Sequence, residues 1–263
     1  MKKVLLATAL LASVVAVAQK DELKTAKKAV KGGDFAAAKA ALKAAEPLIA
    51  NAKDSEKEDF YYLSAMAAYG NGNPQGAAVN ETIDAFNAYL DYSKSSGDTK
   101  YKAEITKLQD ELRGKMVNSS LEAYNAGNYA VAANGFSQLY ELVPTDTVFL
   151  FYSAASSLNA KEYATALEGY KKLMEIGYTG IKDEFVATNK ETGEEENFNS
   201  KNLRDVQIRG GLYENPVDRK TESQRPQIVS TVALLYTQEN RIDEAIETIQ
   251  EARKLNPDEV ELI

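Results

Sequence analysis

Apolar residues recur at helical spacing in five stretches of the chain, and each stretch is centred on a small residue. An aromatic or aliphatic side chain stands three positions before the small residue, and further apolar ones follow it four and seven positions later. The five central residues are Ala38, Ala85, Ala132, Ala166 and Ala245. Positions i, i+3, i+4 and i+7 share one face of an α-helix, so each stretch predicts an amphipathic helix. The second stretch is the weakest, because Thr82 occupies its first apolar position.

The spacing of these alanines indicates a structural repeat. The numbers of Ala132 and Ala166 differ by 34, which is the period of a known class of helical repeat. The two earlier intervals and the last one are longer, and the chain contains two visible insertions. Residues 70–80, rich in Gly and Asn, lengthen the turn of the second repeat, and residues 177–220 separate the fourth repeat from the fifth. A constant period with insertions is typical of a solenoid rather than of unrelated helices.

The pattern resembles that of the tetratricopeptide repeat (TPR) family, whose helix-turn-helix units carry small residues at positions 8 and 20 and a proline at position 32. The alanines above occupy position 20. Position 8 holds Ala26, Ser120, Ala154 and Ala233, and position 32 holds Pro144 and Pro257. The chain departs from the family at position 4, where Met116, Leu150 and Val229 replace Trp, and in an interrupted first helix of the second repeat. The resemblance implies an all-α fold, a right-handed superhelical TPR solenoid.

The long insertion breaks the helical pattern at residues 183–198. Residues 185–188 and a segment ending at Phe198 predict two short strands joined by a Gly-containing turn. A polar helix is expected over residues 200–208, followed by a loop over residues 210–216. Two strands alone are marginally stable in water, so the hairpin should lie against the repeat helices. The expected fold is therefore all-α with one small β-hairpin insertion.

The segment 1–18 has the layout of a secretory signal peptide. Lys2 and Lys3 precede the apolar run Val4–Ala18, which ends in a small-x-small step. One alternative is a membrane anchor, but about 15 helical residues span only about 22 Å of a hydrocarbon core roughly 30 Å thick. The other alternative is a buried first helix. We expect export and cleavage after Ala18, to the periplasm of a Gram-negative bacterium or outside the cell, with no membrane insertion of the mature chain.

These patterns predict four parts of the chain. Residues 1–18 are the signal peptide, 19–176 hold TPR repeats 1–4 with their insertions, 177–220 form the hairpin and loop insertion, and 221–263 hold repeat 5 and the start of a further repeat. Val260–Ile263 would open another first helix. Each repeat buries its apolar side only against a neighbour, so the chain is expected to be a fragment of a longer array.

Composition and charge exclude most catalytic chemistry and one class of partner. The chain has no Cys and no His, which removes thiolate and imidazole metal sites, disulfides and catalytic triads. The net charge of -8 becomes -10 when Lys2 and Lys3 are removed, the wrong sign for binding nucleic-acid phosphates.

Glu194–Glu196 could bind calcium, but the segment lacks the alternating oxygen ligands of a calcium loop, so a solvated turn is expected. We predict no cofactor, no metal and no catalytic residue. An enzyme that uses carboxylates alone is a further alternative, which no motif supports.

The resemblance also implies a ligand surface, because the first helix of each TPR repeat turns one face to a concave groove. The positions of this face hold mainly apolar and aromatic side chains, namely Tyr62, Met66, Tyr69, Val117, Leu121, Tyr124, Phe151 and Leu158. Asn125 and Asn159 lie one residue further along, where they could hydrogen-bond a peptide backbone. The alternative is that these aromatic residues simply pack between neighbouring helices.

The expected function is that of a non-catalytic exported scaffold, which binds a protein or peptide partner in the concave groove. No motif identifies the partner. The alternative is a periplasmic module that binds or processes carbohydrate on tyrosine platforms. The absence of Trp, the usual sugar-stacking residue, argues against that alternative.

Overall fold

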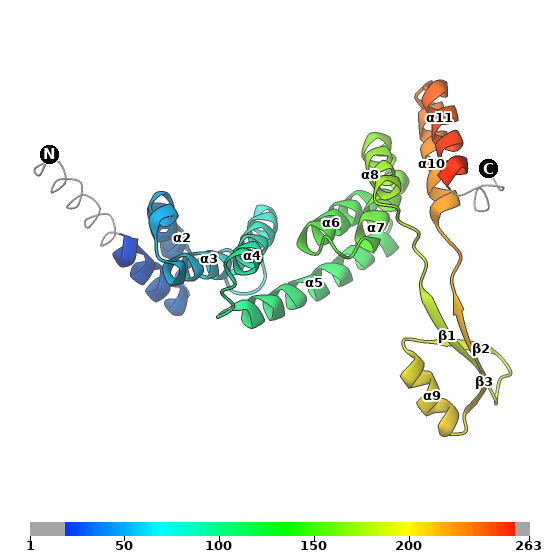
Figure 1. Cartoon of the computed structure of the whole chain (residues 1–263), viewed down its shortest axis with the longest axis horizontal. Helices are drawn as coiled ribbons and strands as arrows, with labels where there is room; N and C mark the ends of the chain where they lie inside the picture. Colours follow the sequence, from blue (N-terminus) through cyan, green and yellow to red (C-terminus); the bar gives the residue numbers. More distant parts are fainter. Residues whose placement is uncertain (1–18, 256–263) are drawn as a thin grey trace, which may run out of the picture. The chain divides into compact units, whose positions relative to one another are not determined.

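The computed structural model describes residues 19–255 and divides into two compact units, with the boundary between Phe149 and Leu150. Figure 1 colours the chain from blue at the N-terminus to red at the C-terminus. The predicted signal peptide, Pro257 of the fifth repeat and the predicted start of a further repeat lie outside the described residues. The two units are described separately.

The first unit consists of consecutive antiparallel helix pairs, as the periodicity predicts. A helix over residues 19–32 pairs with the next helix through a core that contains Leu23, Ala26 and Leu42. The elements that follow residue 32 are α2 (Phe35–Ala45), the 3₁₀ helix η1 (Glu46–Asn51), α3 (Asp54–Tyr69), α4 (Ala77–Ser96), α5 (Lys102–Asn125) and α6 (Tyr129–Leu142). Helix α3 packs on α4, and α5 packs on α6.

The second unit continues with helix pairs on either side of the insertion. Helix α7 (Val148–Asn159), which begins two residues before the boundary, pairs with α8 (Tyr163–Glu175), and α10 (Arg225–Gln238) pairs with α11 (Ile242–Leu255). Helix α10 also packs on α8, so the two pairs share a core across the insertion. The helix-turn-helix repeat fold predicted from the sequence is confirmed.

Tight turns of one geometry join the helices of four pairs. Gly33 and Gly127 take positive φ angles of 74° and 78°, and Lys161 and Asn240 take 63° and 59° at the equivalent places. In all four turns the amide of the next residue donates to the carbonyl five positions earlier over 2.8–2.9 Å. This bond closes a helix with a left-handed residue, which glycine adopts without strain. The repeat is thus visible in the backbone as well as in the side chains.

Small residues let the paired helices approach closely. The marker alanines Ala38, Ala132 and Ala166 are fully buried, and Ala245 is nearly so. Two glycines that the sequence pattern does not single out, Gly135 in α6 and Gly169 in α8, each lie three positions after a marker alanine.

A Cβ atom on either glycine would collide with the partner helix. It would lie 2.9 Å from the Cβ of Ala154 if placed on Gly169, and 2.3 Å from the Oγ of Ser120 if placed on Gly135. Ser120 and Ala154 are the residues at position 8. The pair of small residues, rather than either one, therefore sets the distance between the helices.

The first helix of the second repeat is continuous, which corrects the expectation of an interrupted helix. Helix α3 runs without a break from Asp54 to Tyr69. The segment 70–76, rich in Gly and Asn, lies after it, and Gly70, Gly72 and Gly76 all have positive φ angles. These glycines lengthen the turn to α4, so the prediction for the turn is confirmed.

The insertion is larger than the predicted hairpin. Strands β1 (Asp183–Asn189) and β2 (Glu195–Phe198) form the expected antiparallel hairpin. Residues 210–216 were expected to form a loop, but residues 213–220 form a third strand, β3 (Tyr213–Lys220), on the other side of β1. The order is β2-β1-β3, and β1 and β3 run side by side in Figure 1.

A β-bulge lets β3 contain Asn215 and Pro216, which are typical of turns, and still pair with β1. Thr188 pairs with Glu214 and Val186 pairs with Val217, so two residues of β3 oppose one residue of β1. The two residues opposite Ala187 are Asn215, at a φ of 51°, and Pro216, so β3 holds one residue more than β1 at this point. Proline lacks an amide donor and is tolerated at a bulge or on an edge strand. The Asn-Pro pair therefore marks a bulge here rather than a loop.

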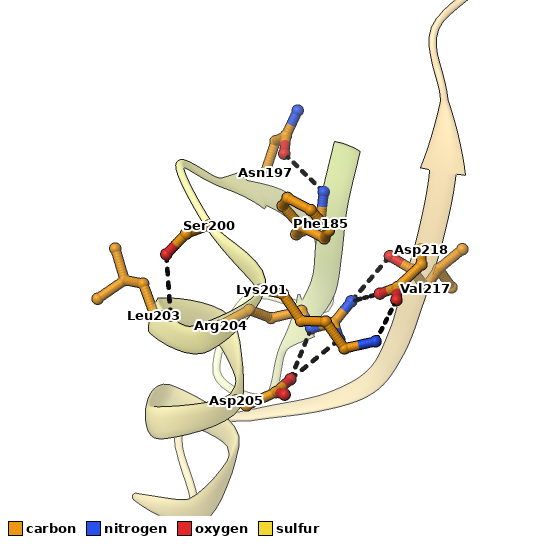
Figure 2. Close-up of polar contacts among 9 residues, drawn as sticks. All are labelled: Phe185, Asn197, Ser200, Lys201, Leu203, Arg204, Asp205, Val217 and Asp218. Carbon is orange, nitrogen blue, oxygen red and sulfur yellow. Dashed lines mark hydrogen bonds and ion pairs between the residues drawn. The ribbon is translucent and has the colours of Figure 1, made fainter. Parts of the chain in front are cut away.

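Helix α9 (Lys201–Arg209) covers the sheet in place of the repeat helices that the sequence suggested. It begins where the side chain of Ser200 accepts a hydrogen bond from the amide of Leu203 over 3.2 Å. Arg204, 3% exposed, reaches from α9 to β3, donates to the carbonyl of Val217 over 3.0 Å and pairs with Asp218 (Figure 2). The insertion therefore supplies its own cover, held by a buried arginine.

Candidate protein-binding surfaces

The first helices of the second and third repeats run parallel in the first unit, in a fixed register. The phenol of Tyr62 on α3 donates to the carboxylate of Glu104 on α5 over 3.1 Å. Further along, the ammonium of Lys115 on α5 donates to the carbonyl of Gly72 over 2.7 Å. The sequence separation is nearly the same in the two pairs, 42 and 43. Helix α3 thus lies alongside residues 104–115.

This register separates the predicted groove residues of α3 from those of α5. Val117, Leu121 and Tyr124 all follow Lys115, which already faces the loop after α3. A helix rises about 1.5 Å per residue, so Tyr124 lies roughly 30 Å along α5 from the residue that faces Tyr62. The cause is the length of α5, which has 24 residues. The first turns of α5 lie beside α3, where a regular repeat would place Val117, Leu121 and Tyr124.

Tyr69 belongs to the core, so its assignment to the groove is wrong. It is 5% exposed, and its ring centroid lies 5.5 Å from that of Phe86. Ile105 and Leu112, from the first turns of α5, belong to the same buried cluster. The extra length of α5 therefore covers the position that faces the groove in a regular repeat. Met66 remains half-buried on the same helix.

Tyr62 takes part in a tyrosine cluster that the sequence did not predict. Its ring stacks on that of Tyr101, with centroids 3.7 Å apart and planes 11° apart. Burial, together with the neighbouring carboxylate of Glu104, raises the pKa of Tyr62 to about 12. Tyr101 in turn donates to Asp59 over 2.6 Å. The hydroxyl groups of both tyrosines are thus occupied within the protein.

Asp59 forms the charged centre of this cluster. Lys100 donates to it over 3.0 Å and lies over the ring of Tyr101, 4.4 Å from the centroid. Burial tends to raise the pKa of Asp59, but the hydrogen bonds from Tyr101 and Lys100 outweigh burial, so the pKa is lowered. The cluster is a self-contained network that fixes α3 on α5.

The C-terminal end of α5 carries the most accessible of the predicted residues. Leu121 is 44% exposed and Tyr124 is 36% exposed, whereas Val117 is half-buried against the core. Asn125, the last residue of α5, is exposed beside them. The edge of the Tyr124 ring meets the ring of Tyr129, with centroids 5.2 Å apart. We call Leu121, Tyr124 and Asn125 the α5-end surface.

The predicted residues of α7 divide between core and surface. Phe151 is half-buried, and its ring stacks on that of Tyr178, with centroids 5.7 Å apart. Leu158 is also half-buried against the core of the second unit. Asn159, the last residue of α7, is exposed. Phe151 and Leu158 therefore contribute to packing, as the alternative interpretation of the aromatic residues held.

Three grooves lie at equivalent places, each between the second helix of one repeat and the helix pair of the next. The α2/α4 groove, over α3, has a volume of about 500 Å³. The groove between the loop before α4 and helices α5 and α6 has about 220 Å³. The α8/α11 groove, over α10, has about 520 Å³. Sequence reasoning placed the ligand surface on the first helices and did not predict these grooves.

The two larger grooves share an apolar floor but differ in charge. In the α2/α4 groove one wall carries Lys39 and Lys43, with Glu46 just beyond α2, and the other carries Glu81 and Asp84. Lys39 pairs with Glu81 over 2.6 Å, so an ion pair joins the two walls. In the α8/α11 groove, by contrast, most of the charged side chains in the lining are glutamates.

Within residues 19–255, no group of three or more Asp or Glu side chains could hold a metal ion, and no helix is long and apolar enough to cross a membrane. Glu194–Glu196 was expected to form a solvated turn, but Glu195 and Glu196 lie in β2. There Glu195 pairs with Arg219, and Glu196 accepts hydrogen bonds from Asn189 and Tyr213. These contacts occupy both carboxylates within the sheet.

Comparisons with known proteins give little further information. No family model matches the chain, and no curated protein matches it. Among solved structures, one titled "Crystal structure of MamA protein" matches with 11% sequence identity over 93% of this chain and 95% of that chain. Its TM-score is 0.30, so this match carries no argument. The TPR-like repeat fold of the chain is established by its own helix pairs, turns and small-residue contacts.

Proposed function

We propose that this protein is an exported, non-catalytic scaffold that binds another protein or a peptide on the surface of its helical repeats. The observation that carries the proposal is the α5-end surface. Leu121 and Tyr124 remain 44% and 36% exposed after the repeats have buried their cores. A large aliphatic and an aromatic side chain beside an exposed amide are typical of a protein-binding surface.

Two further observations support a binding function. The repeats leave grooves of about 500 Å³ with apolar floors, which suit side chains of a partner. The titratable groups of the tyrosine cluster, by contrast, are bonded to one another, so they offer no free acid or base for catalysis. The leader at residues 1–18 supports export.

The experiment is capture of partners from envelope extract with the mature protein, compared with the double variant Leu121→Ala/Tyr124→Ala. Truncation of interface anchors costs about 1–2 kcal/mol or more each, so capture should fall at least about tenfold. The matched control is Val131→Ala/Tyr163→Ala, which removes a more exposed aliphatic side chain and a more exposed tyrosine elsewhere and should leave capture unchanged. Circular dichroism and thermal melting must show that both variants fold.

Two results would contradict the proposal. Equal capture by the wild-type protein and the α5-end variant would show that this surface is not the binding site. Recovery of no protein, together with binding to a glycan array, would favour the carbohydrate-binding module instead. The intact mass of the exported protein should correspond to a chain that begins at Gln19, and a full-length mass would contradict cleavage.

A further inference from the structure

The α8/α11 groove has an apolar floor along α10. Val229 and Val232 are almost completely buried, and the ring of Tyr236, 6% exposed, follows them one turn later. Met174 on α8 and Ala252 on α11 complete the lining on the two sides. A ligand that fills this groove must therefore present apolar side chains towards α10.

One wall of the groove is acidic along its length. Glu244, Glu247 and Glu251 on α11 follow one another at helical spacings of three and four, so they share one face of the helix, and all three line the groove. Glu244 is paired with Arg241 over 2.8 Å. Glu247 and Glu251 form no ion pair or hydrogen bond through their carboxylates with any residue of the described chain.

The opposite side of the groove carries charges of both signs. Glu175 on α8 adds a fourth carboxylate, which pairs with Lys172 over 3.3 Å. The cations that line the groove are Lys171, whose ammonium lies 6.0 Å from the ring centroid of Tyr236, and Arg225. The cations of the groove thus lie on α8 and at the start of α10, whereas every charged residue that α11 contributes to the lining is a glutamate.

We infer that the α8/α11 groove binds an amphipathic α-helix of a partner protein, with Lys or Arg on the flank that faces α11. The inference rests on the proposed function and names a second surface for it. Apolar side chains on one face of such a helix fill the floor along α10. Cations at spacings of three and four on its flank match the spacing of Glu244, Glu247 and Glu251.

The equivalent α2/α4 groove lacks this selectivity. One wall carries Lys39 and Lys43 with Glu46, the other carries Glu81 and Asp84, and the ion pair between Lys39 and Glu81 joins them. A helix that entered it would have to displace or avoid that pair. Charge complementarity thus distinguishes the α8/α11 groove from a groove of nearly the same volume in the other unit.

The test measures binding of designed peptides to the mature protein by fluorescence anisotropy. The probes are helical peptides of about 15 residues, long enough for about four turns. The first carries a leucine face flanked by lysines, the second replaces the lysines by glutamates, and the third has a central proline that prevents a continuous helix. The lysine peptide should bind at least about tenfold more tightly than either of the others.

Charge variants locate the binding. Glu247→Gln/Glu251→Gln should weaken the lysine peptide about three- to tenfold at low salt, with a smaller effect in about 0.5 M salt, where charges are screened. The matched control is Glu191→Gln/Glu194→Gln on the exposed hairpin turn, which changes the net charge equally and should leave the affinity unchanged.

Three results would overturn the inference: equal binding of lysine and glutamate peptides, equal binding of the proline peptide, or equal effects of the two charge variants. The variant Leu121→Ala/Tyr124→Ala distinguishes this failure from failure of the proposed function. If it loses envelope capture but the lysine peptide does not bind the groove, the scaffold proposal stands and only the groove inference fails.

Discussion

The helix pairs and the insertion are stabilised by different means, although they lie in one chain. The pair α7–α8 packs through the close approach of Gly169 to Ala154, and no charged side chain of α7 is buried. The insertion buries the charged side chain of Arg204 beneath α9 and leaves Leu203 and Val206 of that helix 44% and 51% exposed. Helix α9 thus reverses the usual arrangement of polar and apolar faces.

This difference predicts which substitutions the helix pairs and the insertion tolerate. Close-packed helices cannot expand without loss of contacts, so their stability depends on the volume of a few small residues. An ion-paired cover on a three-stranded sheet depends on charge, and its acidic partners are partly exposed to solvent. The repeats should therefore respond most strongly to added volume and the insertion to removed charge.

The largest effect is expected from added volume between α7 and α8. Gly169→Val should destabilise the second unit by about 3 kcal/mol, because its Cβ atom would lie 2.9 Å from the Cβ of Ala154, which cannot rotate away. Thermal and urea unfolding measure the change. The control Glu168→Val places the same side chain one residue earlier on an exposed position and should cost less than about 1 kcal/mol. Similar losses for the two variants would contradict close packing at Gly169.

A smaller and local effect is expected from loss of the buried arginine. Arg204→Met should destabilise α9 and β3 by about 1–3 kcal/mol, since the carbonyl of Val217 loses its donor and Asp218 keeps only Lys201. Amide hydrogen exchange should accelerate over residues 201–220 and remain unchanged in the helix pairs. Exposed Arg209→Met is the control. Acceleration throughout the unit would show that the insertion and the repeats unfold together.

The smallest effect is expected from alkaline pH, in the first unit. Burial, with Glu58 as a hydrogen-bond partner, raises the pKa of Tyr89 to about 12 from its usual 10. The folded state therefore holds this proton more tightly than the unfolded state, so stability is complete below pH 10 and falls between pH 10 and 12. The loss attributable to Tyr89 at pH 11 is at most about 1.4 kcal/mol.

The pH dependence of the Tyr89→Phe variant shows how much of the loss of stability at alkaline pH comes from the titration of Tyr89. The variant should lose stability at all pH values, because Glu58 is 4% exposed and loses its donor. Its decline between pH 9 and 11 should nevertheless be shallower than that of the wild-type protein. An identical decline would mean that the titration of Tyr89 is not linked to folding.

Much of the fold could be predicted because the repeat depends on small residues at the places where paired helices touch. Small residues at fixed spacing predicted the helix pairs, and glycine marks two of their turns, at Gly33 and Gly127. Lys161 and Asn240 occupy the same turns but carry no such signal, since non-glycine residues rarely adopt a positive φ. Strand β3 was missed because Asn215-Pro216 is typical of a loop, and only pairing with β1 makes it a bulge.

The candidate site was predicted less well because it depends on the register between helices. The regular repeat period assigned Tyr69 and Tyr124 equivalent roles, yet the length of α5 buries the first and leaves the second exposed. The sequence offered one signal for this, the uninterrupted helical run from Lys102 to Asn125. The spacing of the glutamates on α11 could have been recognised in the sequence. The groove that they line could not, because it forms only when α8 packs on α10.

The most direct test of the central claim is the hydrogen-exchange footprint of a captured partner on the mature protein. If the repeats form a binding scaffold, exchange should slow over residues 117–125, the segment that contains the α5-end surface, and the Leu121→Ala/Tyr124→Ala variant should show no such protection. Protection confined to the insertion, residues 183–220, with none at the end of α5, would contradict the account.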